Sequence, residues 1–250
     1  MLKDSQIDLC GRVDFTRTQP LLGRDERFSF ACAGCGNCCR GREDIVLSGF
    51  DLWRIAARLR LPPRIVAQGY CRESIGQVSR LPVLRLAPVK ENRNNCPFLT
   101  GDHCAIHDAE PLVCALYPLA QEISREGEVH YFLQPTQCGG RVIEARVSDY
   151  LARYEVPARE KMDVRWAQTC MALEDTVEAL HAQLAPVLLR RLEAKLWQAL
   201  YFDFDFASPF LPQLERNLGW LDGECAKLQG YQARLDSSKQ SNDKFTLIDN

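Results

Sequence analysis

Residues 30–40 read FACAGCGNCCR, and this stretch places four cysteines within eight positions. The first three recur at every third residue and the fourth follows directly: Cys32, Cys35, Cys38 and Cys39. Thiolates crowded so closely repel one another unless a cation neutralises their charge. Gly34 and Gly36 permit the positive φ angles that a tightly curled loop needs. The stretch therefore predicts a loop that folds around a metal centre.

Four further cysteines follow later in the chain: Cys96, Cys104, Cys114 and Cys138. Turn-forming residues flank three of them, whereas Cys114 is expected in a short helix. Turns can aim sulfur atoms at a common centre, whereas a regular strand would alternate them away from it. The eight cysteines of these two sets form the candidate metal ligands.

The chain contains 12 cysteines, and because its first residues have no apolar run we expect neither a signal peptide nor a membrane anchor there. No stretch approaches the length of a membrane span. We therefore expect a cytoplasmic protein, whose thiols are kept reduced. Under those conditions metal ligation is favoured over disulfide bonding. A disulfide framework is the alternative, and it would require export from the cytoplasm.

The charge of the chain is balanced, with 31 basic and 33 acidic residues and a net charge of −2. This balance argues against a general nucleic-acid-binding or anionic-membrane-binding surface. The expected partner or substrate is instead a protein of unknown identity. The sequence has no P-loop and no G-x-G-x-x-G motif, so no nucleotide site is predicted and enzyme activity is left open.

Apolar residues recur at helical spacing along several segments. Helices are expected over residues 49–60, beginning at Ser48, and over 63–71, 142–154, 166–184, 188–200 and 211–229. Extended segments are expected at 44–47, at 81–89 as an edge strand, at 201–206, and as a hairpin over 122–132. The predicted fold class is mainly α with small β elements, in which an irregular metal-stabilised cysteine-rich domain is joined to a helical C-terminal region.

This pattern divides the chain into four segments. They are an N-terminal arm at 1–29, a cysteine-cluster metal-binding domain at 30–155, a helical C-terminal region at 156–233 and a disordered tail at 234–250. Four further cysteines fall outside the candidate set, and one of them, Cys71, lies on the helix expected over 63–71. Cys10 lies in the arm without a cysteine neighbour, and Cys170 and Cys225 follow helical patterns that are typical of core thiols.

Five short motifs occur in a fixed order between Cys32 and Gly140: CxxCxxCC, CPFL, CAIH, PLVC and CGG. In this order they resemble the YkgJ-type CxxCxxCC cysteine-cluster family, a zinc- or iron-chelating domain. The resemblance implies that the eight cysteines bind zinc or iron. It departs at Glu110, where the family usually has arginine before the proline, so no anion-binding role is carried over to that position. The family is also distantly similar to flagellin lysine N-methylases.

Zinc and iron–sulfur centres both use cysteine thiolates. The C-x2-C-x2-C run is typical of bacterial ferredoxins. Structural zinc is often held by two C-x2-C pairs, and the sequence has no distant second pair. We therefore expect an iron–sulfur cluster, with four irons, and keep zinc as the alternative cofactor. Because adjacent side chains diverge, Cys38 and Cys39 are expected to serve two neighbouring sites.

Three functions follow from these expectations. The first is a metal-binding protein whose iron–sulfur cluster has a redox or protein-modification role. The second is a zinc-stabilised protein-interaction module, in which the helical region contacts the partner. The third, implied only by the resemblance, is a SAM-dependent protein lysine N-methylase-like enzyme. His107 follows Cys104 at a zinc-like spacing, but we expect it to pack or to form hydrogen bonds rather than to bind metal.

Overall fold

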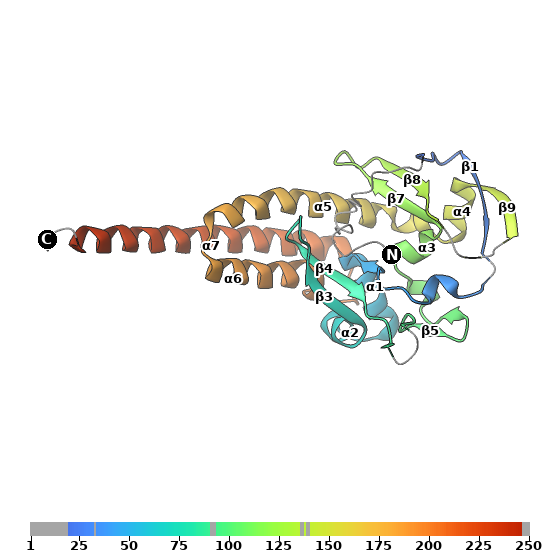
Figure 1. Ribbon diagram of the computed structural model, residues 1–250, viewed down its shortest axis with the longest axis horizontal. Helices are drawn as coiled ribbons and strands as arrows, with labels where there is room; N and C mark the ends of the chain where they lie inside the picture. Colours follow the sequence, from blue (N-terminus) through green and yellow to red (C-terminus); the bar gives the residue numbers. More distant parts are fainter. Residues whose placement is uncertain (1–19, 33, 91–93, 136–137, 139–140, 247–250) are drawn as a thin grey trace.

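The computed structural model describes residues 20–32, 34–90, 94–135, 138 and 141–246. It is 54% helical with 18% strand, which confirms a mainly α fold with small β elements. A bundle of long helices forms one end of the elongated molecule, and short helices and strands form the other (Figure 1). Cys10, Gly139 and Gly140 lie outside the described residues.

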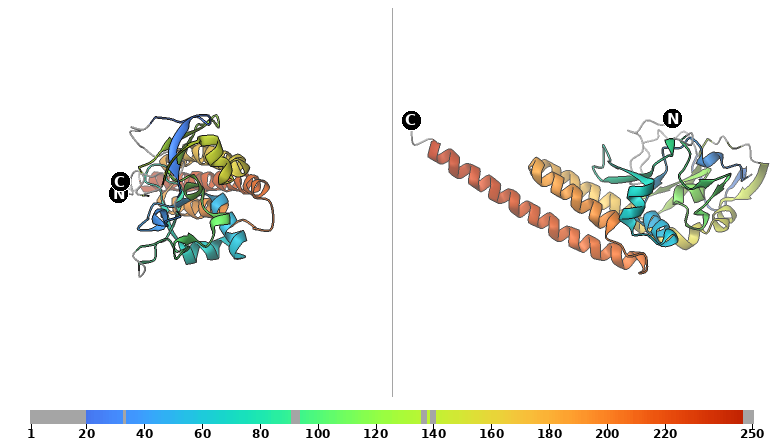
Figure 2. Two further views of the ribbon diagram at one scale, coloured as in Figure 1. Left: turned by 90° about the vertical axis from the view of Figure 1, so that its right-hand side faces the viewer. Right: turned by 90° about the horizontal axis from the view of Figure 1, so that it is seen from below.

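Three helices make the bundle: α5 (Val156–Gln183), α6 (Pro186–Trp197) and α7 (Phe210–Thr246). Their buried apolar residues recur at spacings of three and four, which places them on one face of each helix; they include Leu173, Val177, Leu180, Leu188, Leu192 and Leu196. Helix α7 continues well past the ends of the other two (Figures 1 and 2). The helix ends at Thr246, so residues 234–246 are helical, whereas the sequence predicts a disordered tail there. In the described part of the chain, no helix is long and apolar enough to cross a membrane.

Helix α1 (Gly49–Leu59) begins after Ser48, as predicted. The Ser48 hydroxyl accepts a hydrogen bond from the Asp51 N–H at 3.0 Å, and the Asp51 carboxylate accepts one from the Ser48 N–H at 2.9 Å. This reciprocal capping box satisfies amide groups that the start of a helix leaves unpaired. Helix α2 (Pro63–Tyr70) follows, so both helices predicted in this region are confirmed.

An antiparallel sheet next to these helices has the strand order β2–β4–β3. Its strands are β2 (Val46–Leu47), β3 (Cys71–Ile75) and β4 (Pro82–Leu86). Strand β4 is central and buried along its whole length, so the prediction of an edge strand is wrong. A proline is tolerated there because Pro82 is the first residue of the strand.

We call the end of the molecule that is formed by short helices and strands the mixed region. Two further strand pairs lie in it. Strand β1 (Arg27–Ala31) pairs with β9 (Arg141–Arg146), and β7 (Leu119–Ile123) pairs with β8 (Val129–Leu133). The second pair is the predicted hairpin. The first pair shows that the helix predicted over 142–154 is wrong in its first part, because α4 covers only Val147–Arg153. Valine and isoleucine at 142 and 143 suit a strand, and pairing with β1 decides the outcome.

Gly49 lies where α1 meets the C-terminal region. A Cβ atom there would lie 2.3 Å from the Leu200 carbonyl oxygen and 2.5 Å from the Trp166 ring, so only glycine fits. Leu200 belongs to a π-helical turn, Gln198–Phe202 (η5), whose Tyr201 hydroxyl donates to the Leu47 carbonyl at 3.1 Å. The extended segment predicted over 201–206 is therefore wrong at its start, because this turn packs against α1.

Candidate metal centre

A cavity of about 460 Å³ lies among the loops of the mixed region. All eight cysteines of the candidate set line it: Cys32, Cys35, Cys38, Cys39, Cys96, Cys104, Cys114 and Cys138. Of the other cysteines that the structure describes, none lines this cavity. Cysteine segments that are far apart in the sequence therefore meet at one place.

The first cysteine loop turns at Gly36, whose φ is +66°. A Cβ atom on Gly36 would lie 3.1 Å from the Asp102 carbonyl oxygen and 2.7 Å from the Arg40 guanidinium, so both the backbone angle and the close approach require glycine. Arg40 donates to the Cys35 carbonyl at 2.7 Å and forms an ion pair with Asp102. These contacts fasten the loop to the turn that precedes Cys104.

Short elements carry the next cysteines. A 3-10 helix, Asn37–Cys39 (η2), carries the adjacent pair, and the Cys96 N–H donates to the Cys39 carbonyl at 2.8 Å. Cys104 lies in β6 (His103–Cys104), which pairs with β5 (Leu99–Thr100). Cys114 lies in α3 (Leu112–Leu116), the short helix that the sequence predicts.

Two pairs of sulfur atoms lie at the separation that a metal ion would impose. The Sγ atoms of Cys35 and Cys138 are 3.8 Å apart, and those of Cys38 and Cys39 are 3.9 Å apart. In a tetrahedral site with metal–sulfur bonds of about 2.3 Å, neighbouring sulfur atoms lie about 3.8 Å apart. The donors and their spacing therefore fit a thiolate-bound metal. Within the described residues, no group of three or more His, Cys, Asp or Glu side chains is by itself arranged to hold an ion.

Cys38 and Cys39 interact with three cysteines from later in the chain, and the division of the pair between two neighbouring sites stays a prediction. Cys39 interacts electrostatically with Cys96 and Cys104, and both members of the pair interact electrostatically with Cys114. A group of five thiols results: Cys38, Cys39, Cys96, Cys104 and Cys114. The other three cysteines are the close pair Cys35–Cys138 and Cys32, which interacts with Tyr150 and Tyr154.

Four thiols of the five-thiol group have a raised pKa, whereas the interaction with Cys39 lowers the pKa of Cys96. The hydrogen bond with Cys39, together with burial, raises the pKa of Cys38 far above its usual range. The hydrogen bond with Cys38 lowers the pKa of Cys39, but the contact with Cys96 and burial outweigh it and raise that pKa to about 12. Burial also raises the pKa of Cys114. A cation that binds here must therefore displace protons from sulfur.

The rest of the cavity wall is acidic and aromatic. The Glu110 side chain is 13% exposed, lies 3.2 Å from His107, and has a carboxyl pKa that burial raises. Aromatic residues also line the cavity: Phe30, Phe98, Tyr117, Tyr150 and Tyr154. Among the lining residues that the structure describes, none is lysine or arginine. The wall therefore favours cations over anions.

Tyr150 and Tyr154 also line the cavity, although no motif of the sequence marks them. Their rings lie 4.8 Å apart between centroids, and the two residues are separated by four positions at the end of α4. That spacing places two side chains on one helix face and was the available signal. His103 and His107 also line the cavity, whereas His130 and His181 are not among its described lining residues.

Comparison with known proteins agrees with this geometry. Residues 31–139 match the model of the CxxCxxCC family, which carries the description "Putative zinc- or iron-chelating domain". The matched segment includes all eight cavity cysteines, and the match confirms the family resemblance. Neither a search of curated proteins nor a search of solved structures found a match.

Proposed function

Because residues 31–139 match the model of the CxxCxxCC family, we propose that the cysteine cavity binds an iron–sulfur cluster through its thiolates and has a redox role. The observation that carries this proposal is the meeting of eight cysteines in one cavity of about 460 Å³. A closed structural zinc site needs only four thiolates around a single ion. Twice that number of thiols, around a volume typical of ligand pockets, suits a larger centre or more than one centre.

Charge and ligand softness support the proposal. Eight thiolates would bring eight negative charges to a cavity whose described lining includes no lysine or arginine. Buried charges without partners are unfavourable, so the sulfur atoms either remain protonated or bind cations. Thiolates select soft or borderline metals, which include iron–sulfur clusters and zinc. We assign the cluster ligands to the five-thiol group of Cys38, Cys39, Cys96, Cys104 and Cys114. When bound, the cluster would supply one-electron chemistry.

Zinc is the second candidate. The sulfur separations of 3.8 and 3.9 Å favour it, because they match the edge of a tetrahedral four-thiolate site. In that case the metal would stabilise the fold and the helical bundle would be the surface offered to a protein partner. The methylase alternative receives no specific support from the described residues, and we do not propose it.

A reducing compartment is part of the proposal. Every cysteine in the described part of the chain is a free thiol. The cytoplasm maintains such thiols, whereas an oxidising compartment would pair the closest of them as disulfides. The proposed partner for electron exchange is a protein.

Anaerobic purification of the full chain tests the proposal. An iron–sulfur cluster predicts brown protein with visible absorption that bleaches on reduction, and equal amounts of iron and acid-labile sulfide. Colourless protein that contains zinc and no sulfide would select the second candidate. Protein that retains neither iron nor zinc, even after anaerobic reconstitution with each, would reject both.

A further inference from the structure

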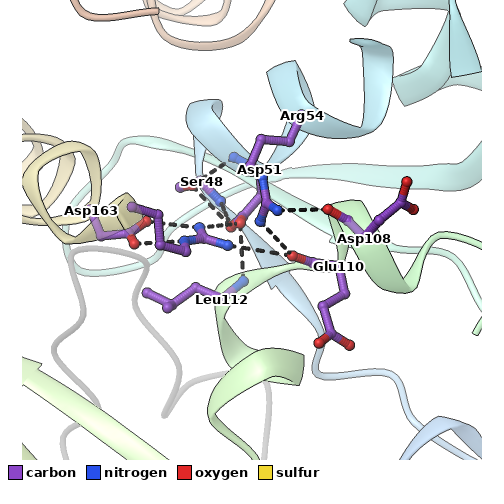
Figure 3. Close-up of polar contacts among 8 residues, drawn as sticks. Ser48, Asp51, Arg54, Asp108, Glu110, Leu112 and Asp163 are labelled. Atoms are coloured by element: carbon purple, nitrogen blue, oxygen red, sulfur yellow. Dashed lines mark hydrogen bonds and ion pairs between the residues drawn. The ribbon is translucent and has the colours of Figure 1, made fainter. Parts of the chain in front are cut away.

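A buried ionic network lies outside the cavity and joins α1, the segment before α3, and α5 (Figure 3). Asp51, Arg159 and Asp163 are only 2%, 4% and 4% exposed. Buried charges of this kind persist only where each one is paired and hydrogen-bonded. The network is therefore held in one geometry, and any backbone group that it binds is held with it.

Asp51 connects the start of α1 to the start of α3. Its Oδ2 accepts hydrogen bonds from the N–H and the hydroxyl of Ser48, both at 2.9 Å. Its Oδ1 accepts a hydrogen bond from the Leu112 N–H at 3.0 Å and one from the Arg159 guanidinium at 2.6 Å. Leu112 is the first residue of α3, and Cys114 follows two residues later. One carboxylate thus caps α1 and anchors the helix that carries Cys114.

Two guanidinium groups hold the chain just before that helix. Arg159 binds both oxygens of Asp163, with hydrogen bonds of 2.7 and 2.8 Å, and donates to the Glu110 carbonyl at 3.3 Å. Arg54 donates to the same carbonyl at 3.2 Å and to the Asp108 carbonyl at 2.8 Å. Figure 3 shows the Arg54 side chain directed at Asp108 and Glu110, in the segment between Cys104 and Cys114.

Helix α3 needs such external support. It has five residues, and its N-cap residue, Pro111, has no side chain that accepts a hydrogen bond from the first amide groups of the helix. A helix of that length is not stable alone in water. A metal ligand must nevertheless be held close to its productive position by the groups around it. Asp51 supplies the missing amide acceptor, and Arg159 orients Asp51 from α5.

We propose that Asp51 and Arg159 are positioning residues that direct Cys114 into the cavity and thereby set its affinity for metal. This inference rests on the proposed metal-binding function. It gives the C-terminal helical region a part in the site, because Arg159 and Asp163 lie beyond the segment that matches the family model. Loss of contacts that orient a metal ligand typically weakens metal binding by about 10–100-fold.

Two substitutions at Leu112 isolate the key hydrogen bond. Leu112→Ala and Leu112→Pro both remove the leucine side chain, but only proline lacks the N–H that binds Asp51. Proline is tolerated at the first position of a helix, and Pro111 already has an extended backbone with φ −57° and ψ 151°. We expect cobalt(II), added anaerobically to the metal-free full chain with a competing chelator, to bind Leu112→Pro about tenfold or more weakly than Leu112→Ala.

A second pair of variants tests Arg159. Arg159→Lys keeps the charge but loses the planar fork that reaches two acceptors. Arg165→Lys is the control, because Arg165 lies on the same helix and forms an exposed pair with Glu215. We expect Arg159→Lys, and not the control, to reduce the thiolate-to-cobalt charge-transfer absorption per bound ion, which a general loss of stability would not change.

The outcomes separate the inference from the function on which it rests. Equal cobalt affinity of the two Leu112 variants, together with unchanged absorption in Arg159→Lys, would overturn the positioning role while the wild-type chain still binds cobalt through sulfur. A wild-type chain that binds cobalt without any thiolate absorption would instead overturn the proposed metal-binding function.

Discussion

The sulfur atoms of Cys35 and Cys138 lie 3.8 Å apart, although 103 positions separate the two residues. Strand pairing explains this proximity. Ala31 at the end of β1 and Arg141 at the start of β9 are antiparallel partners. The chain therefore leaves β1 next to the point at which it enters β9. This backbone pairing brings the first and last cysteine segments together.

Cavity cysteines should differ from core cysteines in their effect on metal binding. Replacing Cys39 or Cys114 with serine removes a soft donor, so we expect metal affinity to fall at least about tenfold. Cys225→Ser is the matched control, because Cys225 is half-buried on α7 and does not line the cavity that the structure describes. Metal per chain, measured after dialysis against a weak chelator, checks the prediction. Equal metal content in all three variants would reject the ligand assignment.

Gly36 and Gly34 offer a matched pair for the geometry of the loop. Both have positive φ, +66° and +64°, so alanine at either position costs about 1–2 kcal/mol of backbone strain. Only Gly36 has neighbours within 4 Å of a Cβ atom, among them the Asp102 backbone. We therefore expect Gly36→Ala to lower metal affinity and the free energy of unfolding more than Gly34→Ala. Chelator competition and urea denaturation measure the two effects, and equal losses would contradict the close packing of the loop on Asp102.

Gly49 tests the contact between α1 and the C-terminal region. A Cβ atom there would lie 2.3 Å from the Leu200 carbonyl oxygen, so we expect Gly49→Ala to destabilise the protein by about 1–3 kcal/mol through overpacking. Gly219→Ala is the control on the exposed side of α7, where nothing lies within 4 Å. It should stabilise the protein by about 0.5–1 kcal/mol through helix propensity. Urea denaturation gives both values, and stabilisation by Gly49→Ala would refute the contact.

Metal removal should destabilise the cysteine region. The free energy of binding metal to ligands on loops contributes directly to folding, so we expect the midpoint of thermal unfolding to fall by about 10 °C or more. Calorimetry under reducing conditions, before and after chelation, measures the change. An unchanged unfolding profile after complete metal loss would show that metal is not part of the folded structure.

Local signals made parts of this fold predictable. The start of α1 could be predicted because Ser48 and Asp51 are three residues apart, so the capping hydrogen bonds between them are local. The candidate cysteines could be identified because their spacing and the turns around them are local features. All eight line the cavity that the structure shows.

Other parts depend on distant contacts that the sequence does not display. Residues 141–146 contain residue types that fit a helix or a strand, and only pairing with β1 selects the strand. Strand β4 has prolines near its ends, which suggest an edge, yet it is paired on both sides. Arg159 lies on a helix with an ordinary pattern, and its role depends on Asp51, which is 108 positions away.

X-ray absorption at the metal edge of the anaerobically purified full chain identifies the atoms bound to the metal, and so tests whether the cavity cysteines bind it. We expect a first coordination shell dominated by sulfur at about 2.3 Å, for iron or for zinc, which the Cys114→Ser variant loses or weakens. A shell made only of oxygen or nitrogen at about 2.0–2.2 Å, unchanged in that variant, would contradict metal binding by the cysteine cavity.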